Sequence, residues 1–361
     1  MRIVHVVGAV GPHTRGLQAT LAALSAGYAA AGHEAVLVVP GPEDRTDDDG
    51  CRSRLVLRAP AVARTGSRLL VEPDRVARLL DRLAPDRLEL SDPGTLRGLG
   101  WWARAAGVPS VALHAAAPDD VLAGLLPGPL PGLLPARRLA ARLATRTAAA
   151  VDTTVALSPR AAALLVTAGV PHVVVPPGVD LARFTPCRAD AATRARLAAG
   201  ADVVLLHRAE PGPARDRGVL TAQRTAAGLR AAGTRVRLAV VGRGRLCAEG
   251  SADDVLLGPV PDEDLPALLA CADVVLSAGP TAEPGWHDVA TLEALACGTP
   301  VIAAEDVDAV RAVVAAGPGA RRAARAGAEE QPWSATVLRM LALHGAGRAA
   351  RHAAVLSGRG R

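Results

Sequence analysis

The sequence contains no lysine, and all 41 of its basic residues are arginine. Aromatic residues make up only 2% of the chain, whereas alanine, glycine and proline are abundant, as in proteins from GC-rich genomes. Without lysine the chain has no Walker A phosphate loop. Without aromatics it lacks the stacking platforms that single-stranded nucleic acids need. Despite a net charge of +6, we therefore expect acidic small molecules or phospholipid surfaces as partners, and no nucleic acid.

Paired cysteines and long apolar runs are also missing. The five cysteines form no CxxC pair and show no His/Cys ligand spacing, so we expect reduced thiols, mostly in the core, and no metal site. No stretch of about 18 apolar residues could span a bilayer, and Met1–Val10 lacks a signal-peptide cleavage pattern. These absences predict a cytoplasmic protein.

Short Val/Leu-rich runs alternate with longer Ala/Leu/Arg stretches of helical period, which indicates an α/β fold of doubly wound parallel sheets. With 361 residues the chain is long enough for two domains. Expected strands cover residues 3–8, 35–40, 54–59, 88–91, 110–114, 154–157, 172–175, 203–207, 235–241, 255–257, 274–277 and 301–303. Expected helices cover residues 17–31, 73–83, 95–106, 136–150, 219–232, 263–271, 288–296, 306–316, 320–328 and 333–344. Loops are expected over 11–16 and 208–217, and a partly frayed basic tail over 345–361.

One strand–loop–helix unit, residues 272–303, combines features of a binding site. In a parallel sheet the helix N-terminus, with its unpaired N–H groups and partial positive charge, lies above the carboxyl end of the strand. Glu283 precedes the expected helix and Glu293 lies inside it. Acids beside an anion-binding helix end suit a ligand that has both phosphates and hydroxyls, and a nucleotide-sugar is such a ligand.

Fingerprints of other enzyme classes are missing. Gly8, Gly11 and Gly16 do not fit G-x-G-x-x-G, and the second strand ends in Pro40-Gly41-Pro42 where a dinucleotide enzyme has an acid for the ribose. Neither H-E-x-x-H nor G-x-S-x-G occurs. A nicotinamide-dependent enzyme is therefore disfavoured.

Five blocks of the sequence, distributed over nearly the whole chain, resemble the family 4 retaining glycosyltransferases of the GT-B fold, in the family's order. The blocks are GLQATLAALSAGYAAAGHEAVLVVPGP, VPPGVDLARFTP, LAVVGRGRL, LGPVPDEDLPALLACADVVLSAGP and ATLEALACGTPVIA. The closing QPWSATVLRMLALHG is similar to actinobacterial mannosyltransferase-like members. The resemblance implies two Rossmann-like domains facing a central cleft. It places an acceptor domain at 1–182, a donor domain at 183–332, and a helix returning to the first domain plus a basic tail at 333–361.

The resemblance also implies roles for single residues. Glu293 matches the glutamate that binds the nucleotide ribose, Glu283 resembles the one that holds the transferred sugar, and Arg208 resembles the arginine that neutralises the diphosphate. Gly16 falls in the N-terminal glycine loop near the phosphates, and His114 matches a histidine near the reacting sugar. Further donor-binding positions implied by the family pattern are Arg215, Gly242, Val260 and Leu292.

Taken together, the resemblance implies a glycosyltransferase that moves a hexose, most plausibly mannose from GDP-mannose, to a lipid, glycan or small-molecule acceptor. It implies no cofactor, no required metal and no covalent nucleophile. Two alternatives remain. The longer spacing between Glu283 and Glu293 and the missing diphosphate lysine, for which Arg215 or Arg217 is the nearest substitute, also suit a non-catalytic relative that acts as a nucleotide-binding or partner subunit. A sugar-nucleotide epimerase of similar architecture has no specific support.

Local alternatives remain for several residues. His114 follows an apolar strand and could equally be a buried core histidine. Glu283 could be a plain loop acid. Asp288 is expected to cap the helix rather than to form a catalytic pair with His287. The pair Trp101-Trp102 is most simply assigned to the core.

A separate hypothesis concerns membranes. The run LAGLLPGPLPGLLP, residues 122–135, is apolar, and the helix that follows carries Arg138, Arg142 and Arg146 at i, i+4 spacing. Apolar surface next to a basic face is what interfacial binding requires, so these residues could dock on an anionic membrane at its inner face. A packed loop and a solvated helix face would explain the pattern equally well.

Overall fold

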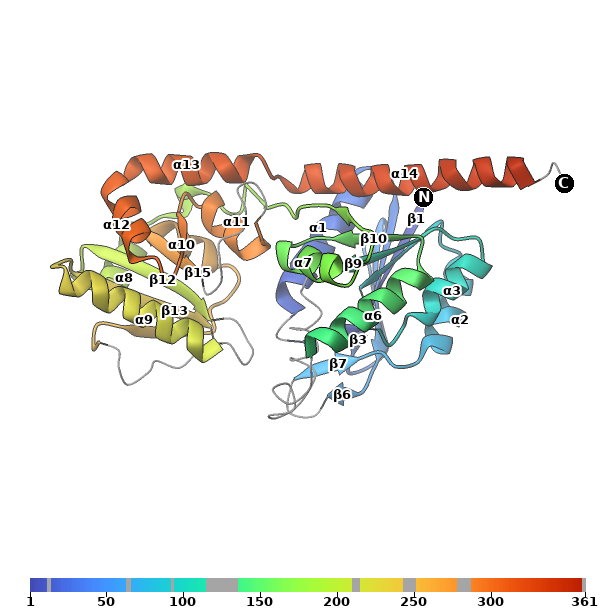
Figure 1. The fold of residues 1–361 in the computed structure, drawn as a ribbon, viewed down its shortest axis with the longest axis horizontal. Helices are drawn as coiled ribbons and strands as arrows, with labels where there is room; N and C mark the ends of the chain where they lie inside the picture. Colours follow the sequence, from blue (N-terminus) through green and yellow to red (C-terminus); the bar gives the residue numbers. More distant parts are fainter. Residues whose placement is uncertain are drawn as a thin grey trace. The chain divides into compact units, whose positions relative to one another are not determined.

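The computed structural model describes residues 1–11, 14–62, 66–91, 94–114, 136–209, 215–242, 251–277 and 287–358; the side chains of residues 15, 136–137, 215–216 and 346–358 lie outside the description. The chain divides into two compact units (Figure 1). Unit 1 contains Met1–Pro177 and Trp333–Arg361, and unit 2 contains Gly178–Pro332. The division therefore falls at Pro177, five residues before the boundary expected from the sequence, and the C-terminal segment packs with the first half of the chain.

Unit 1 is built on a sheet whose strand order is β11-β10-β9-β8-β1-β3-β5-β4, parallel except for β4 at one edge. The strands are β1 (Arg2–Val7), β3 (Glu34–Gly41), β4 (Arg45–Asp48), β5 (Arg52–Arg58), β8 (Arg87–Ser91), β9 (Ser110–His114), β10 (Thr153–Ala156) and β11 (Val173–Val174). A small antiparallel sheet is formed by β2 (Ala9–Val10), β6 (Ala61–Val62) and β7 (Ser67–Leu69). Strand β4 and this small sheet were not predicted, because strands of two to four residues are too short to establish an alternating pattern.

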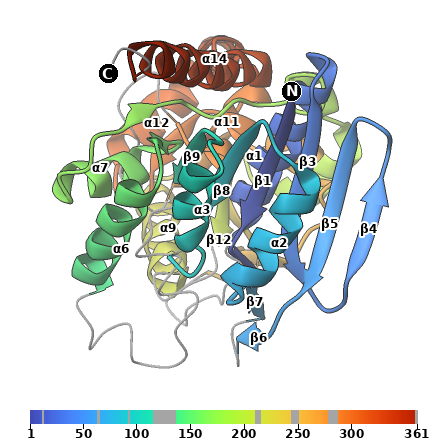
Figure 2. The same ribbon diagram turned by 90° about the vertical axis from the view of Figure 1, so that its right-hand side faces the viewer.

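Helices cover both faces of this sheet. They are α1 (Arg15–Ala30), α2 (Pro73–Leu83), α3 (Gly98–Ala105), α6 (Ala136–Ala150), α7 (Pro159–Thr167) and α14 (Trp333–Gly358). One face packs its leucines and valines against α2 and α3, and Figure 2 shows α6 beside α3 on that side. The opposite face packs against α1 and α14 through Leu24, Tyr28, Val337 and Met340. The sheet is therefore buried on both sides, which explains the nearly continuous apolar runs of its central strands.

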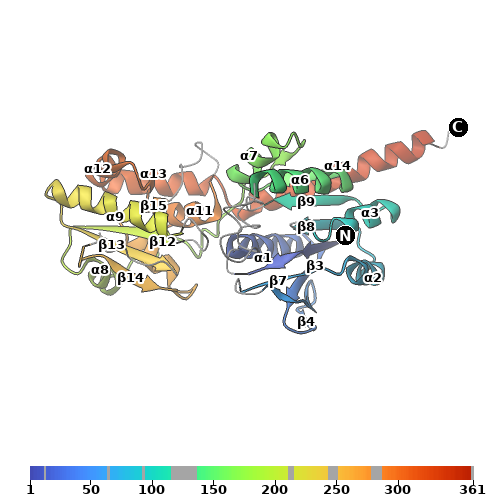
Figure 3. The same cartoon turned by 60° about the horizontal axis from the view of Figure 1, so that its bottom comes forward.

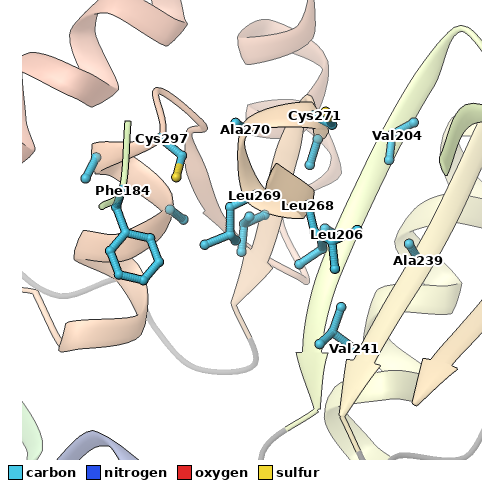
Figure 4. Packing of buried hydrophobic residues seen from close by; sticks show 14 of the residues in the cluster. Phe184, Val204, Leu206, Ala239, Val241, Leu268, Leu269, Ala270, Cys271 and Cys297 are labelled. Carbon is cyan, nitrogen blue, oxygen red and sulfur yellow. The ribbon is translucent and has the colours of Figure 1, made fainter. Parts of the chain in front are cut away.

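Unit 2 is a five-stranded parallel sheet with the order β14-β13-β12-β15-β16 (Figure 3). Its strands are β12 (Val203–Ala209), β13 (Val236–Gly242), β14 (Val255–Gly258), β15 (Val274–Ser277) and β16 (Val301–Ala303). Its helices are α8 (Ala191–Ala198), α9 (Arg215–Ala231), α10 (Leu265–Cys271), α11 (Val289–Ala296), α12 (Val307–Ala316) and α13 (Pro318–Glu329), with a 3-10 turn η2 (Pro186–Arg188). Leu206, Leu268 and Phe184 belong to the core on one face, drawn in Figure 4. Helices α9 and α12 pack on the other face.

Several expected boundaries were wrong. Helix α1 begins at Arg15, so Gly16 lies on a helix and not in the expected loop. Arg208 lies on β12 and not in the loop after it, because the strand continues to Ala209 alongside β13. The last helix continues to Gly358, past the expected end at His344, because the alanine-rich sequence that follows has high helix propensity. Trp101 is 51% exposed and therefore not a core residue.

Two further observations concern cysteines and membranes. Of the cysteines that the structure describes, Cys271 and Cys297 are buried, whereas Cys51 and Cys187 are exposed, so the expected core role holds for two of them. Among the described helices, none is long and apolar enough to cross a bilayer.

Candidate functional site

The strand order of unit 2 reverses between β12 and β15. From β12 the chain adds β13 and β14 on one side, then β15 and β16 on the other. In open parallel sheets, ligands bind at the carboxyl ends of the two strands at such a switch point, where the outgoing loops separate. Helix α11 is the next described element after β15. Its N-cap Asp288 accepts a hydrogen bond from the Thr291 N–H at 2.7 Å, which confirms the expected capping role.

Arg208 and Glu293 meet at this switch point. Arg208 lies one residue before the end of β12, and its Nη1 donates to Glu293 Oε2 at 2.6 Å and lies 3.5 Å from the Ala290 carbonyl oxygen. The Glu293 side chain is 13% exposed. Burial raises the pKa of Glu293 above its ordinary value, and the nearby charge of Arg208 opposes that rise. The structure thus brings together two residues 85 positions apart that the sequence selected separately.

The remaining N–H groups of Arg208 are not used by described residues. Among the described residues, Nε and Nη2 of Arg208 form no hydrogen bond, since both of its contacts use Nη1. A guanidinium can hold a carboxylate with one edge and phosphate oxygens with the other. The pair can therefore remain in place while Arg208 binds an anion.

Two residues fix the strands around the pair. Gly242 ends β13 with φ +110°, and a Cβ there would lie 2.7 Å from the Ala209 carbonyl oxygen, so only glycine fits this close approach of two strand ends. His207, buried on β12, lies with its Nδ1 2.9 Å from the Leu276 carbonyl oxygen of β15. Burial lowers the pKa of His207, which favours the neutral ring. Gly242 and His207 therefore keep the carboxyl ends of β12, β13 and β15 close together next to Arg208.

Sequence reasoning missed one cation at this site. Arg183 is exposed and lies near the start of unit 2. Its Nη2 donates to the Asp262 carbonyl oxygen at 2.6 Å, and its guanidinium lies 5.0 Å from the Phe184 ring centroid. Its charge also acts on Glu293, whose pKa it lowers, though less than Arg208 does. Arg183 lies within the block VPPGVDLARFTP, but nothing in that block points to a partner, because only the fold places residues 183 and 262 side by side.

The other predicted donor residues of unit 2 have different surroundings. Leu292 is fully buried in the core, so its side chain packs and only its backbone could contact a ligand. Val260 follows β14 and is partly buried against the same core. Arg215 begins α9, but its side chain lies outside the described residues, and so does Glu283 entirely.

Unit 1 has its own switch point, between β1 and β8, and the predicted residues of this unit lie at two different places. His114 is the last residue of β9; it is buried, and its Nε2 has no hydrogen-bond partner among the described residues. Burial, together with the nearby His172, lowers the pKa of His114 to about 4, so the ring is neutral at pH 7. Gly16 is exposed in the first turn of α1, and a Cβ there would meet no atom within 4 Å. Space alone therefore gives no reason for glycine at position 16.

No metal centre is evident among the described ranges: His, Cys, Asp and Glu form no group of three or more that could hold an ion. The cationic features at the switch point of unit 2 are Arg208, Arg183 and the partial positive charge at the start of α11, and these suit an anionic ligand.

Two family models match the chain. The model described as glycosyl transferase 4-like domain matches residues 15–178, and the model described as glycosyl transferases group 1 matches residues 208–342. A curated protein of Mycobacterium tuberculosis, a GDP-mannose-dependent α-(1-6)-phosphatidylinositol dimannoside mannosyltransferase, is 35% identical over 332 residues, which cover 89% of this chain and 83% of that protein.

Solved structures show the same fold at lower identity. Sucrose-phosphate synthase from Thermosynechococcus elongatus superposes with a TM-score of 0.72 at 17% identity, covering 97% of this chain and 100% of that one. Anabaena HepE, solved with UDP and glucose, gives a TM-score of 0.63 at 16% identity, covering 95% and 98% of the two chains. Both confirm the expected arrangement of parallel sheets flanked by helices. The two family models, the mycobacterial relative and the fold together show that this chain is an enzyme of the family 4 glycosyltransferases with the GT-B fold.

Proposed function

We propose that the enzyme transfers mannose from GDP-mannose to an acceptor hydroxyl with retention at the anomeric carbon, without a metal or a cofactor. The observation that carries the proposal is the Arg208–Glu293 pair at the switch point of unit 2, joined by a 2.6 Å hydrogen bond. The mycobacterial relative, named as GDP-mannose-dependent, supports the choice of donor. The acceptor belongs to the class of lipids, glycans or small hydroxylated molecules.

The chemistry of the reaction assigns work to these residues. Breaking the bond between the anomeric carbon and the diphosphate leaves negative charge on the departing phosphate oxygens. The free N–H groups of Arg208 stabilise that charge, and Glu293 accepts hydrogen bonds from the ribose hydroxyls. The acceptor oxygen forms the new bond on the same face, and its proton passes to the departing diphosphate. His114 serves as a neutral hydrogen-bond partner of the sugar, since its lowered pKa of about 4 keeps it uncharged.

Calorimetry followed by turnover assays tests the proposal. We expect GDP and GDP-mannose to bind more tightly than UDP, UDP-glucose or ADP, and Glu293→Ala to weaken GDP binding at least 10-fold. A matched control is Glu329→Ala, which removes an exposed acid on α13 of the same unit. Tight UDP binding without GDP binding would contradict the choice of donor.

Turnover separates the enzyme from its alternative. Release of GDP from GDP-mannose, measured with and without a mixture of glycolipid and sugar acceptors, should depend on Glu293 and Arg208. A chain that binds GDP but releases none with any acceptor would act as a nucleotide-binding subunit, which the altered spacing of Glu283 and Glu293 would then explain. Absence of any nucleotide binding would refute both assignments.

A further inference from the structure

Positive charge is concentrated in two parts of the chain. Residues 94–179 contain seven arginines and three acids, a net charge of +4, and residues 333–361 contain five arginines and no acid, a net charge of +5. Within the described ranges 94–114 and 136–179 the sole acid is Asp152, and its carboxylate accepts hydrogen bonds from the Ser110 backbone N–H and hydroxyl. The described surface of this segment is therefore basic.

The charge of residues 94–179 lies mainly on two neighbouring helices of unit 1, α3 and α6 (Figure 2). Arg138, Arg142 and Arg146 are all exposed and follow one another at single-turn spacing along α6, roughly 6 Å apart. None of the three has an acidic partner among the described residues, whereas Arg2, Arg75, Arg194, Arg230 and Arg235 each pair with an Asp or Glu. Unpaired guanidinium groups in a row are available to an external anion.

Exposed apolar side chains lie on the same surface. Trp101 on α3 is 51% exposed, and Leu139 on α6 is 38% exposed. The Arg104 guanidinium lies 4.7 Å from the Trp101 ring centroid and donates from Nη2 to the Ala149 carbonyl oxygen at 3.3 Å. Arg104 therefore connects the tryptophan to the end of α6 where the arginine row finishes. We call the surface formed by Trp101, Arg104, Arg138, Leu139, Arg142 and Arg146 the α3–α6 face.

We propose that the α3–α6 face binds the surface of an anionic phospholipid bilayer. Arginine guanidinium groups pair with lipid phosphates, tryptophan is enriched at the level of the headgroups, and a leucine among arginines buries its side chain at the acyl boundary. The charge complementarity favours a phosphate-rich surface, and the exposed Trp101 and Leu139 favour a bilayer over a purely polar anion. Binding here is independent of the donor chemistry at Arg208 and Glu293, which belong to unit 2.

Vesicle flotation measures this binding directly. The full chain should float with vesicles of phosphatidylcholine containing phosphatidylglycerol and remain unbound with phosphatidylcholine alone. Charge reversal in the triple variant R138E/R142E/R146E should lower the partition coefficient about 100-fold, and raising the salt concentration should weaken binding of the unchanged protein. The matched control R196E/R311E/R322E makes the same charge change at exposed arginines of unit 2 and should retain binding within about threefold of the unchanged protein. Equal loss in both triple variants would overturn the proposal, because net charge alone would then explain binding.

Tryptophan quenching tests the contact itself. Brominated phosphatidylglycerol should quench part of the protein fluorescence, and Trp101→Phe should remove that part. Unchanged quenching in Trp101→Phe would show that another surface touches the lipid. Thermal unfolding and GDP calorimetry of every variant detect misfolding, and a variant that binds GDP but not vesicles supports the proposal even if no transfer activity is ever found. If the protein binds single-stranded RNA but no vesicles, the α3–α6 face binds nucleic acid and the proposal of a bilayer is wrong.

Discussion

Two glutamates, the fully buried Glu89 of unit 1 and the largely buried Glu293 of unit 2, have opposite surroundings. Glu89 lies in the middle of β8 and is fully buried; its carboxylate accepts hydrogen bonds from Tyr28 Oη at 2.7 Å and lies 2.8 Å from both His5 Nδ1 and His344 Nε2. Glu293 has one described polar partner, Arg208. Burial alone would raise the pKa of Glu89, but the hydrogen bonds from His344 and His5 outweigh it and hold the pKa well below its ordinary value.

The partners of each carboxylate separate a structural acid from a binding acid. Glu89 has partners for both oxygens and joins three elements, α1, β1 and α14, to β8. Because both oxygens have partners within the protein and the side chain is fully buried, Glu89 is not accessible to a ligand. Glu293 keeps a raised pKa and an oxygen without a described partner, which is the state expected of a group that awaits a ligand.

Removing Glu89 should give the largest effect on stability. Glu89→Ala leaves two buried histidines and a buried tyrosine without their acceptor and detaches His344 of α14, so we expect a loss of about 3 to 5 kcal/mol in the free energy of unfolding. Urea unfolding followed by circular dichroism measures it. Glu34→Ala, which removes a partly exposed partner of Arg2, should cost less than about 1 kcal/mol. Similar losses in both variants would show that Glu89 contributes no more to stability than a partly exposed ion-pair partner.

Arg208→Ala should act on activity instead. Without the guanidinium, the departing diphosphate loses a charged donor, and we expect kcat/KM to fall about 100-fold, with little change in the urea midpoint. Arg208→Lys should recover only part of the activity, because an ammonium cannot serve Glu293 and a phosphate with separate edges. Arg235→Ala, which breaks an exposed ion pair with Asp202, should leave kcat/KM unchanged. A large stability loss in Arg208→Ala with normal kcat/KM would contradict the site assignment.

The pH dependence of stability should have opposite sign at the two acids. The pKa of Glu89 is lowered by folding, so its contribution is present above the unfolded value, about 4.3, and is lost as the pH falls through the folded value. The pKa of Glu293 is raised by folding, so stability is lost as the pH rises through its folded value. In Glu89→Gln, the free energy of unfolding should fall less steeply at acid pH than in the unchanged protein. In Glu293→Gln, the free energy of unfolding should rise relative to that of the unchanged protein as the pH rises. Urea titrations from about pH 2 to 8 cover both ranges, and slopes of the same sign for the two acids would refute the contrast.

Tyr28→Phe should have the smallest effect on the free energy of unfolding. Burial, with the charge of Glu89, raises the pKa of Tyr28, so the hydroxyl remains a donor to the carboxylate. The variant removes one of three partners, and we expect a loss of about 1 kcal/mol. Combining it with Glu89→Gln should give less than the sum of the separate losses, because the two groups contact each other. If the two losses in the free energy of unfolding simply add, the Tyr28 hydroxyl stabilises the protein through contacts other than the one with Glu89.

Local pattern predicted the elements whose apolar period is regular and whose ends carry clear signals. Helix α2 matches the expected 73–83, with Pro73 at its start, and β9, β15 and β16 match their expected ranges. The short helices α7 and α8 were missed, since eight or nine residues give too few turns to establish a period. The resemblance selected Arg208 and Glu293, but their direct pairing and the proximity of Arg183 depend on contacts across the fold.

The α/β class, the family and most central strands could be predicted, because they follow from hydrophobic period and from short motifs that are continuous along the chain. Three facts required the folded structure: Glu89 has partners for both oxygens while Glu293 does not, Trp101 is exposed beside Arg104, and α14 joins unit 1 through His344. These facts depend on which distant side chains meet and on which surface remains uncovered. Neither is encoded in a local pattern, because burial and pairing arise only when the elements pack.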